Sequence, residues 1–430
     1  MLNLYLLLIW HILASWYVLP ITACKPDPAP APPPPPPACS IGKSIKDYLD
    51  DSTFGNKREK IDRIPNTVVV EVLVVIDYSL SDKIGTFYKD GVWRAKPSSP
   101  KTKDRKAEAI LYVRKFMSAV AIKFRRHFKK PRIQFSIAGV LVGEPLPFIV
   151  DKGGFDILQT HKNMKQFFGN ETYKARFPFD VVLLLTGEER FKKMSGLDEK
   201  YGLTEVGRAC DYERFNFGPN LNHANIIVQD LGQFSGVKTA THQFGHILGS
   251  YSDGEKSSKS CCSREGYIMS KNIYDKNNID NVFKNKRNAY KWSTCSKEVI
   301  INFVRNASCL FNTPTEDPYP LFNWQELTQN WQVPHLSDQC SVYVPEKEDV
   351  ELVDYVGYDC GNDPCQFLEC QTVFEQCFDC LEHLRTDCKV QERQNAMEGS
   401  MCGENKNCFQ GNCINGKKAV GSLENNIRTL

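Results

Sequence analysis

The distribution of cysteines is the strongest constraint on how this chain can fold. The chain of 430 residues contains 17 cysteines, and ten of them lie within the 74 residues from Cys340 to Cys413. Proteins of reducing compartments rarely contain so many cysteines. The density of cysteines here therefore predicts an oxidising environment and a C-terminal module built on disulfides. The odd total predicts one free thiol or an intermolecular bridge, unless processing removes a cysteine.

The N-terminal segment indicates export from the cell. Residues Leu2 to Leu19 are almost wholly apolar, and small or uncharged residues follow them, which predicts a signal peptide at 1–23. Because no lysine or arginine precedes this apolar run, a retained membrane anchor is the alternative. We expect a secreted, extracellular protein with no membrane span after signal cleavage. Sequons at Asn170 and Asn306 are expected to carry N-glycans.

A proline-rich stretch separates this segment from the rest of the chain. The run from Pro32 to Pro37 favours extended polyproline II and cannot form a core, which predicts a linker at 24–65. Cys24 and Cys39 flank the run and are expected to pair. The formal net charge of +3 is too small to direct the whole molecule to nucleic acid, so we expect no nucleic-acid partner.

Strand and helix patterns alternate after the linker, which predicts an α/β domain. The strands are expected where β-branched and apolar residues dominate, and the helices where apolar residues recur every three or four positions. The expected strands are Thr67–Asp77, Ile133–Val142 and Phe179–Leu185, and the expected helices are one through Ile110 and Phe128 that stops at Pro131 and one around Phe155–Phe168.

One histidine pair carries the candidate chemistry. His242 and His246 are four residues apart and therefore share a helix face, so two imidazoles could bind one metal ion. Gly249 is expected to end the helix and turn the chain back. A third ligand three residues later would complete a site with an open position, and Ser252 occupies that place.

This stretch resembles the zinc-binding motif of the metzincin metalloproteases, His-Glu-x-x-His-x-x-Gly-x-x-His, in its adamalysin or reprolysin form. The positions that match are His242, His246, Gly249, Asp253 and Gly254. Met269, in Tyr-Ile-Met-Ser, resembles the Met-turn that lies beneath the metal in this family. The likeness covers residues 66–310 and implies a metzincin-like mixed, mainly parallel sheet flanked by helices, with zinc as the cofactor.

Two departures from the motif bear on activity. Gln243 stands where the family has the general-base glutamate, and a neutral amide cannot take a proton from a metal-bound water. Ser252 replaces the third histidine and is a weak zinc ligand. Asp253 is a possible substitute ligand, although in the family this aspartate usually has a structural role. Zinc binding is therefore an open expectation.

The resemblance also implies disulfides and a second module. It suggests that Cys210 pairs with Cys309, and Cys295 with either Cys261 or Cys262. Residues 311–430 are similar to the cysteine-rich extensions of secreted relatives, and we expect the ten cysteines there to pair among themselves.

Three functional hypotheses follow from these residues. The first is a secreted reprolysin-like homologue without peptidase activity that acts as an extracellular binding protein, with an extracellular protein or matrix as partner. The second is an active zinc metalloendopeptidase that uses Asp253 and another base. The third is a disulfide-rich adhesion or decoy protein for which the protease domain is a scaffold.

Positive charge is concentrated in residues 101–132. This segment holds twelve lysines and arginines against Asp104 and Glu108. A solvated helix face is one interpretation. The other is a docking face for an acidic glycosaminoglycan, because clustered cations bind through local potential rather than net charge. The residues expected to make that contact are Arg114, Lys115, Arg125, Arg126, Lys129 and Lys130.

Overall fold

The structure is a computed structural model, and every residue it describes belongs to the unit formed by residues 39–430 rather than to the unit 1–38. The described residues are 65–84, 86–89, 92–95, 103–142, 146–151, 154–189, 201–215, 219–271, 286–312, 314, 317–329, 333, 336, 339, 365, 368–371, 390–394 and 396–415. The predictions of a signal peptide, a proline-rich linker and a Cys24–Cys39 bridge lie outside these residues, apart from Pro65.

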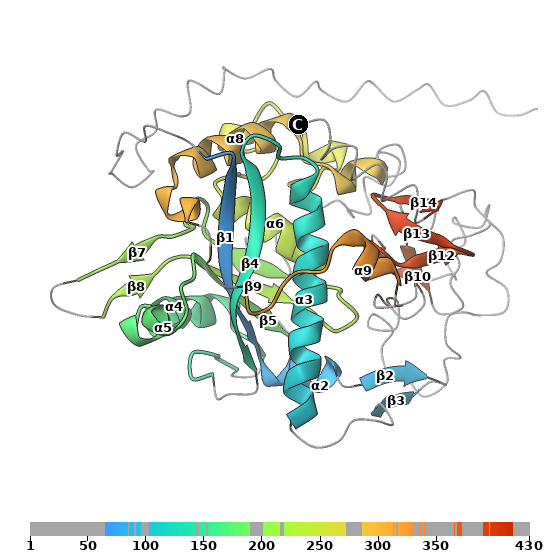
Figure 1. The fold of residues 1–430 in the computed structure, drawn as a ribbon, viewed down its shortest axis with the longest axis horizontal. Coiled ribbons are helices and arrows are strands. Elements are labelled where there is room, and N and C mark those ends of the chain that lie inside the picture. Colours follow the sequence, from blue (N-terminus) through green and yellow to red (C-terminus); the bar gives the residue numbers. More distant parts are fainter. Residues whose placement is uncertain are drawn as a thin grey trace, which may run out of the picture. The chain divides into compact units, whose positions relative to one another are not determined.

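Within the described part of the chain, a five-stranded sheet has the order β4-β1-β5-β9-β6. Figure 1 labels β4, β1, β5 and β9 of this sheet. Its strands are β1 (Thr67–Ile76), β4 (Arg132–Val142), β5 (Val181–Thr186), β9 (Asn225–Gln229) and β6 (Gly202–Thr204). The strands β4, β1, β5 and β9 are parallel, and β6 pairs antiparallel with β9 at the edge. The sheet is therefore mixed and mainly parallel, as the resemblance implied.

Helices and shorter strands surround this sheet. The helices are α2 (Tyr78–Ile84), α3 (Lys103–Arg125), α4 (Ile157–Phe167), α5 (Glu171–Arg176), α6 (Val237–Ile247), α8 (Thr294–Asn306) and α9 (Trp324–Gln329), with short 3₁₀ turns at Lys256–Ser258, Ser263–Glu265, Lys286–Tyr290 and Ser308–Phe311. The remaining strands are β2 (Thr86–Lys89), β3 (Val92–Ala95), β7 (Tyr212–Glu213), β8 (Leu221–Asn222), β10 (Leu368–Gln371), β11 (Val390–Gln394), β12 (Met401–Gly403), β13 (Lys406–Phe409) and β14 (Asn412–Asn415).

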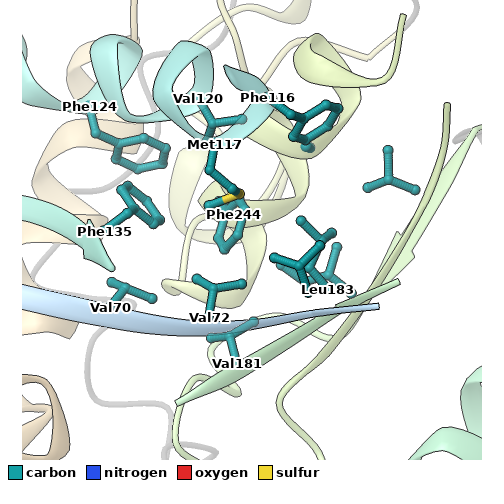
Figure 2. Close-up of a cluster of buried hydrophobic side chains, with 14 of the residues drawn as sticks. Val70, Val72, Phe116, Met117, Val120, Phe124, Phe135, Val181, Leu183 and Phe244 are labelled. Atoms are coloured by element: carbon teal, nitrogen blue, oxygen red, sulfur yellow. The ribbon is translucent and has the colours of Figure 1, made fainter. Parts of the chain in front are cut away.

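Both faces of β1 are buried, because its side chains alternate between two hydrophobic clusters. Val70 and Val72 pack with side chains of α3 and α6, including Met117 and Phe244 (Figure 2). Leu73 packs in the second cluster, on the side of the sheet that α4 covers. The α/β prediction rested on the alternation of strand and helix patterns, and the structure confirms it.

The predicted strands and helices lie close to the observed ones, with one difference at the end of α3. This helix ends at Arg125, short of the last apolar position, Phe128. The amides of His127 and Phe128 both donate to the carbonyl of Phe124, so the chain makes a final turn before Pro131 and β4. This turn keeps the side chain of Phe128 fully buried. Phe128 therefore fits the apolar spacing of α3 although it lies beyond the end of the helix.

The described C-terminal residues pack against α3. Ile122 of α3 shares a buried cluster with Trp324, Leu327 and Phe409, and Met397 joins the main core. The boundary predicted at residue 310 stays a prediction. None of the described helices is both long enough and apolar enough to cross a membrane.

Candidate functional site

Helix α6 presents the two candidate histidines on one face, at the edge of the sheet where β6 lies. The rings of His242 and His246 are 4.6 Å apart between centroids and nearly perpendicular, at 82°. Phe244 and Ile247 point into the main core, which fixes the orientation of the helix. The amphipathic pattern of α6 therefore brings the two imidazoles together.

Both imidazoles are held by backbone carbonyls. Nδ1 of His242 lies 2.7 Å from the carbonyl of Ile268, and Nδ1 of His246 lies 2.7 Å from the carbonyl of Ser250. A carbonyl only accepts, so each Nδ1 carries a proton and donates it to the carbonyl. Metal-ligating histidines are commonly oriented by such a bond.

Gly249 ends α6 in the way the sequence predicted. Its φ is +100°, in the region that favours glycine. The amide of Ser250 donates to the carbonyl of Gly245 at 2.9 Å, and the amide of Gly249 donates to that of His246 at 2.8 Å. These two bonds form a Schellman cap, which turns the chain back beneath the histidines.

Met269 lies directly against α6. It is fully buried, and a Cβ added to Gly245 would stand 2.4 Å from its sulfur. The indole of Trp292 lies on the same side of Gly245, with its Cζ3 2.8 Å from that position. Glycine at 245 thus allows Met269 and Trp292 to pack on the helix between His242 and His246.

Gln243 is directed toward the edge strand. Its side chain is buried, and its Cγ and Nε2 both lie 3.1 Å from the place that a Cβ at Gly202 would occupy. The amide therefore lies beside β6, on the helix that carries both histidines. Sequence analysis missed β6, because a strand of three residues is too short to show an alternating pattern.

Ser252 and Asp253 follow the turn at Gly249, and both are buried. Oδ1 of Asp253 accepts hydrogen bonds from the hydroxyls of Ser293 at 2.7 Å and Ser296 at 3.1 Å, at the start of α8. Burial raises the pKa of Asp253 to about 6, although these two hydrogen bonds oppose the shift. Its carboxylate thus joins the turn to the N-terminus of α8.

The residues present fit a zinc ion poorly. Among the described residues, His242 and His246 do not belong to any set of three His, Cys, Asp or Glu ligand atoms within 4.8 Å of one another. Catalytic zinc takes three strong protein ligands and an open position. Besides the two imidazoles, the motif offers Ser252, whose neutral hydroxyl is a weak zinc ligand, and Asp253, whose Oδ1 is bonded to the hydroxyls of Ser293 and Ser296.

Two cysteine-containing sets do meet that distance, but their chemistry excludes them as metal sites. They are Cys365, Cys402 and Cys413, and Asp180 with Cys210 and Cys309. The cysteines in both sets are disulfide-bonded, and a cysteine has to be a thiolate in order to ligate a metal.

The disulfides join distant parts of the chain. The structure contains the bridge Cys210–Cys309 and pairs Cys295 with Cys261, which decides between the two alternatives. Cys262 is disulfide-bonded as well. In the tail, Cys365 pairs with Cys408 and Cys402 with Cys413. Such bridges are consistent with an extracellular protein.

The two candidate glycosylation sites lie on the surface. Asn170 is exposed and caps α5, where its side-chain oxygen accepts from the amide of Thr172 at 2.9 Å. Asn306 is exposed at the end of α8. Glycans at these positions stay predictions.

Comparisons with known proteins find relatives that are named metalloproteinases. No protein-family model matches the chain. A Bombyx mori protein named "A disintegrin and metalloproteinase with thrombospondin motifs like" is 24% identical over 381 residues, which is 81% of this chain and 45% of that protein. Venom metalloproteinase 2 of Eulophus pennicornis is 27% identical over 199 residues, 44% of this chain and 40% of that protein.

A third relative, "A disintegrin and metalloproteinase with thrombospondin motifs 16" of Mus musculus, is 24% identical and covers 41% of this chain and 12% of that protein. The chain spans less than half the length of these three relatives. Together with the mainly parallel sheet, these low-identity relatives support a reprolysin-type metalloprotease family, in which zinc dependence is implied.

Proposed function

We propose that this chain is a secreted reprolysin-like homologue without peptidase activity that acts as an extracellular binding protein. The observation that carries the proposal is Gln243, an amide on the helix between the two histidines. In this family, bound zinc activates a water molecule for attack on a peptide bond. Gln243 holds the place of the group that should receive the proton of that water.

An amide cannot replace the carboxylate in proton transfer. An amide oxygen can accept a hydrogen bond, but it does not take up a proton near neutral pH. General acid–base groups typically contribute about 10² to 10⁴ in rate, so losing one slows hydrolysis severely. The side chain is buried against β6, and this packing does not give the amide a basic group.

The metal ligands support the same proposal. His242 and His246 would be the residues that hold zinc, since their Nδ1 atoms are fixed by carbonyls. Ser252 supplies only a neutral hydroxyl, and the carboxylate of Asp253 is bonded to Ser293 and Ser296. Affinity for zinc is expected to be weak.

Zinc content and peptide cleavage, measured on the purified protein, test the proposal. We expect no turnover of a peptide library by the native sequence or by Gln243→Glu. The double variant Gln243→Glu, Ser252→His restores both missing groups and is expected to bind zinc more tightly than the native chain. Any cleavage it gains should disappear in a matched triple variant that also carries His242→Ala.

Cleavage by the unmutated protein that a chelator abolishes would contradict the proposal and favour the active-enzyme alternative. Stoichiometric zinc without cleavage would contradict only the weak-affinity part and leave the missing general base as the cause of inactivity.

A further inference from the structure

A compact basic surface lies at the C-terminal end of α3. Four cationic residues follow one another there in six positions, and all are exposed: Arg125, Arg126, Lys129 and Lys130. Arg305 of α8 is exposed and joins them, because its guanidinium donates to the carbonyl of Lys130 at 3.3 Å. Figure 1 shows α8 on the side of the molecule where α3 ends. We call these five residues the basic turn.

The backbone beneath the basic turn is fixed from within. Phe124 and Phe128 are fully buried and pack their rings against Trp292, with centroids 4.7 and 5.6 Å from it. The amide of Arg132 donates to the carbonyl of Asn66 at 2.8 Å. A surface held in this way loses little backbone entropy when a ligand binds, which favours affinity.

The electrostatic environment of the turn is positive. His127 lies within it, and its pKa is lowered to about 4 by burial and by the charges of Arg126, Lys297 and Lys123. The one opposing influence is a backbone hydrogen bond at Tyr290, and no acidic side chain is among the main causes. Glu298 on α8 is exposed and adds one negative charge against the cations of that helix.

Two cations of α3 outside the basic turn are held by contacts within the molecule. Arg114 donates to the carbonyl of Pro320 at 2.8 Å and lies 4.3 Å over the ring of Phe322. Lys123 is buried and pairs with Glu398. Arg126 belongs to the exposed basic turn and also contacts the C-terminal residues. Its guanidinium donates to Gln410 and lies 5.5 Å from the ring centroid of Phe409. Arg114 and Lys123 thus stabilise the packing of the chain, whereas the cations of the basic turn are exposed.

We propose that the basic turn binds a sulfated glycosaminoglycan chain, and that Arg305 takes part while Arg114 does not. A linear polyanion matches a row of closely spaced cations, and the gain comes from counterion release and local potential rather than from net charge. The planar guanidinium of arginine can donate two hydrogen bonds to one sulfate group, as it does to phosphate. This function is independent of whether the protein cleaves peptides.

Heparin binding, measured by titration at several salt concentrations, tests the proposal. The variant Arg125→Gln, Arg126→Gln, Lys129→Gln, Lys130→Gln is expected to bind at least about tenfold more weakly, with a smaller dependence of affinity on salt. The matched control is Lys106→Gln, Lys162→Gln, Arg214→Gln, Lys259→Gln, four exposed residues elsewhere, which makes the same change in net charge. It should bind as the native chain does.

A second measurement uses the unmutated protein and so does not depend on how the variants fold. Heparin should protect Lys129 and Lys130 from amine acetylation and leave Lys162 reactive. Equal losses in the two quadruple variants, or unprotected Lys129 and Lys130, would overturn the proposal. So would binding of an acidic polypeptide, but not heparin, to the basic turn. Arg305→Gln should weaken binding and Arg114→Gln should not, and the reverse order would contradict the assignment of residues.

Discussion

Replacing Glu398 by glutamine tests whether a buried ion pair holds the C-terminal segment on α3. The ammonium of Lys123 lies 3.5 Å from Oε1 of Glu398, and the two side chains are only 9% and 2% exposed. Oε2 of Glu398 also accepts from the amide of Gln410 at 2.8 Å. Glutamine keeps the shape and an acceptor for Gln410, but leaves the charge of Lys123 without its counterion.

The magnitude follows from burial. Removing one partner of a buried pair typically costs about 3 to 5 kcal/mol, because the other charge stays desolvated. The ring of Tyr290, 4.7 Å from the ammonium of Lys123, offsets part of this by a cation–π contact. We therefore expect Glu398→Gln to lose about 3 kcal/mol.

Urea unfolding of the disulfide-intact chain measures this loss, and hydrogen exchange of residues 396–415 shows whether it is local. The matched control is Asp82→Asn, which breaks the exposed pair with Arg105 at 3.3 Å and should cost no more than about 1 kcal/mol. The double variant Lys123→Met, Glu398→Leu should recover most of the loss, because no unpaired charge remains. Equal effects of Glu398→Gln and Asp82→Asn would refute the reasoning.

Other predictions concern the core and the floor of the site. Burial raises the pKa of Asp230 to about 6, while hydrogen bonds from Tyr112, Gly232 and Ser235 oppose the shift. Because the folded state favours the protonated carboxyl, the stability that this raised pKa contributes is full below pH about 4 and is lost as pH rises through about 6. Asp230→Asn should remove up to about 3 kcal/mol of that pH dependence in unfolding experiments at pH 4 and 7, and an unchanged slope would contradict it. Gly245→Ala should cost about 1 to 3 kcal/mol by thermal unfolding, since its Cβ meets Met269 and Trp292. Gly403→Ala, whose Cβ would lie no closer than 3.6 Å to its neighbours, is the control, and equal melting temperatures would argue against this packing.

The local patterns that rest on backbone geometry were predictable from the sequence. The run Thr67–Asp77 predicted β1 because β-branched residues on both faces require burial on both faces. The spacing of His242 and His246 and the glycine at 249 predicted one helix face and its end, because both follow from 3.6 residues per turn and from the left-handed cap.

Features that depend on contacts between distant segments were not predictable. Cys261 and Cys262 are neighbours, and only the position of α8 decides that Cys295 meets Cys261. Asp253 was a candidate ligand in the sequence, whereas the structure bonds it to Ser293 and Ser296, forty residues or more further along the chain. A motif in the sequence identifies the residues of a site, but it does not show which neighbouring residues their side chains bond to in the folded chain.

The basic segment 101–132 shows why local charge alone does not predict a binding surface. Its lysines and arginines alternate with the apolar residues of an amphipathic helix, so some of them must lie at the border of the buried face. There Lys123 and Arg114 meet the carboxylate, carbonyl and aromatic groups of the C-terminal residues, and their charge serves the packing of the chain. Arg125 is the last residue of α3, and Lys129 and Lys130 follow in the turn, where all three side chains are exposed. The end of the helix, rather than the count of basic residues, therefore marks where closely spaced cations are exposed to a partner.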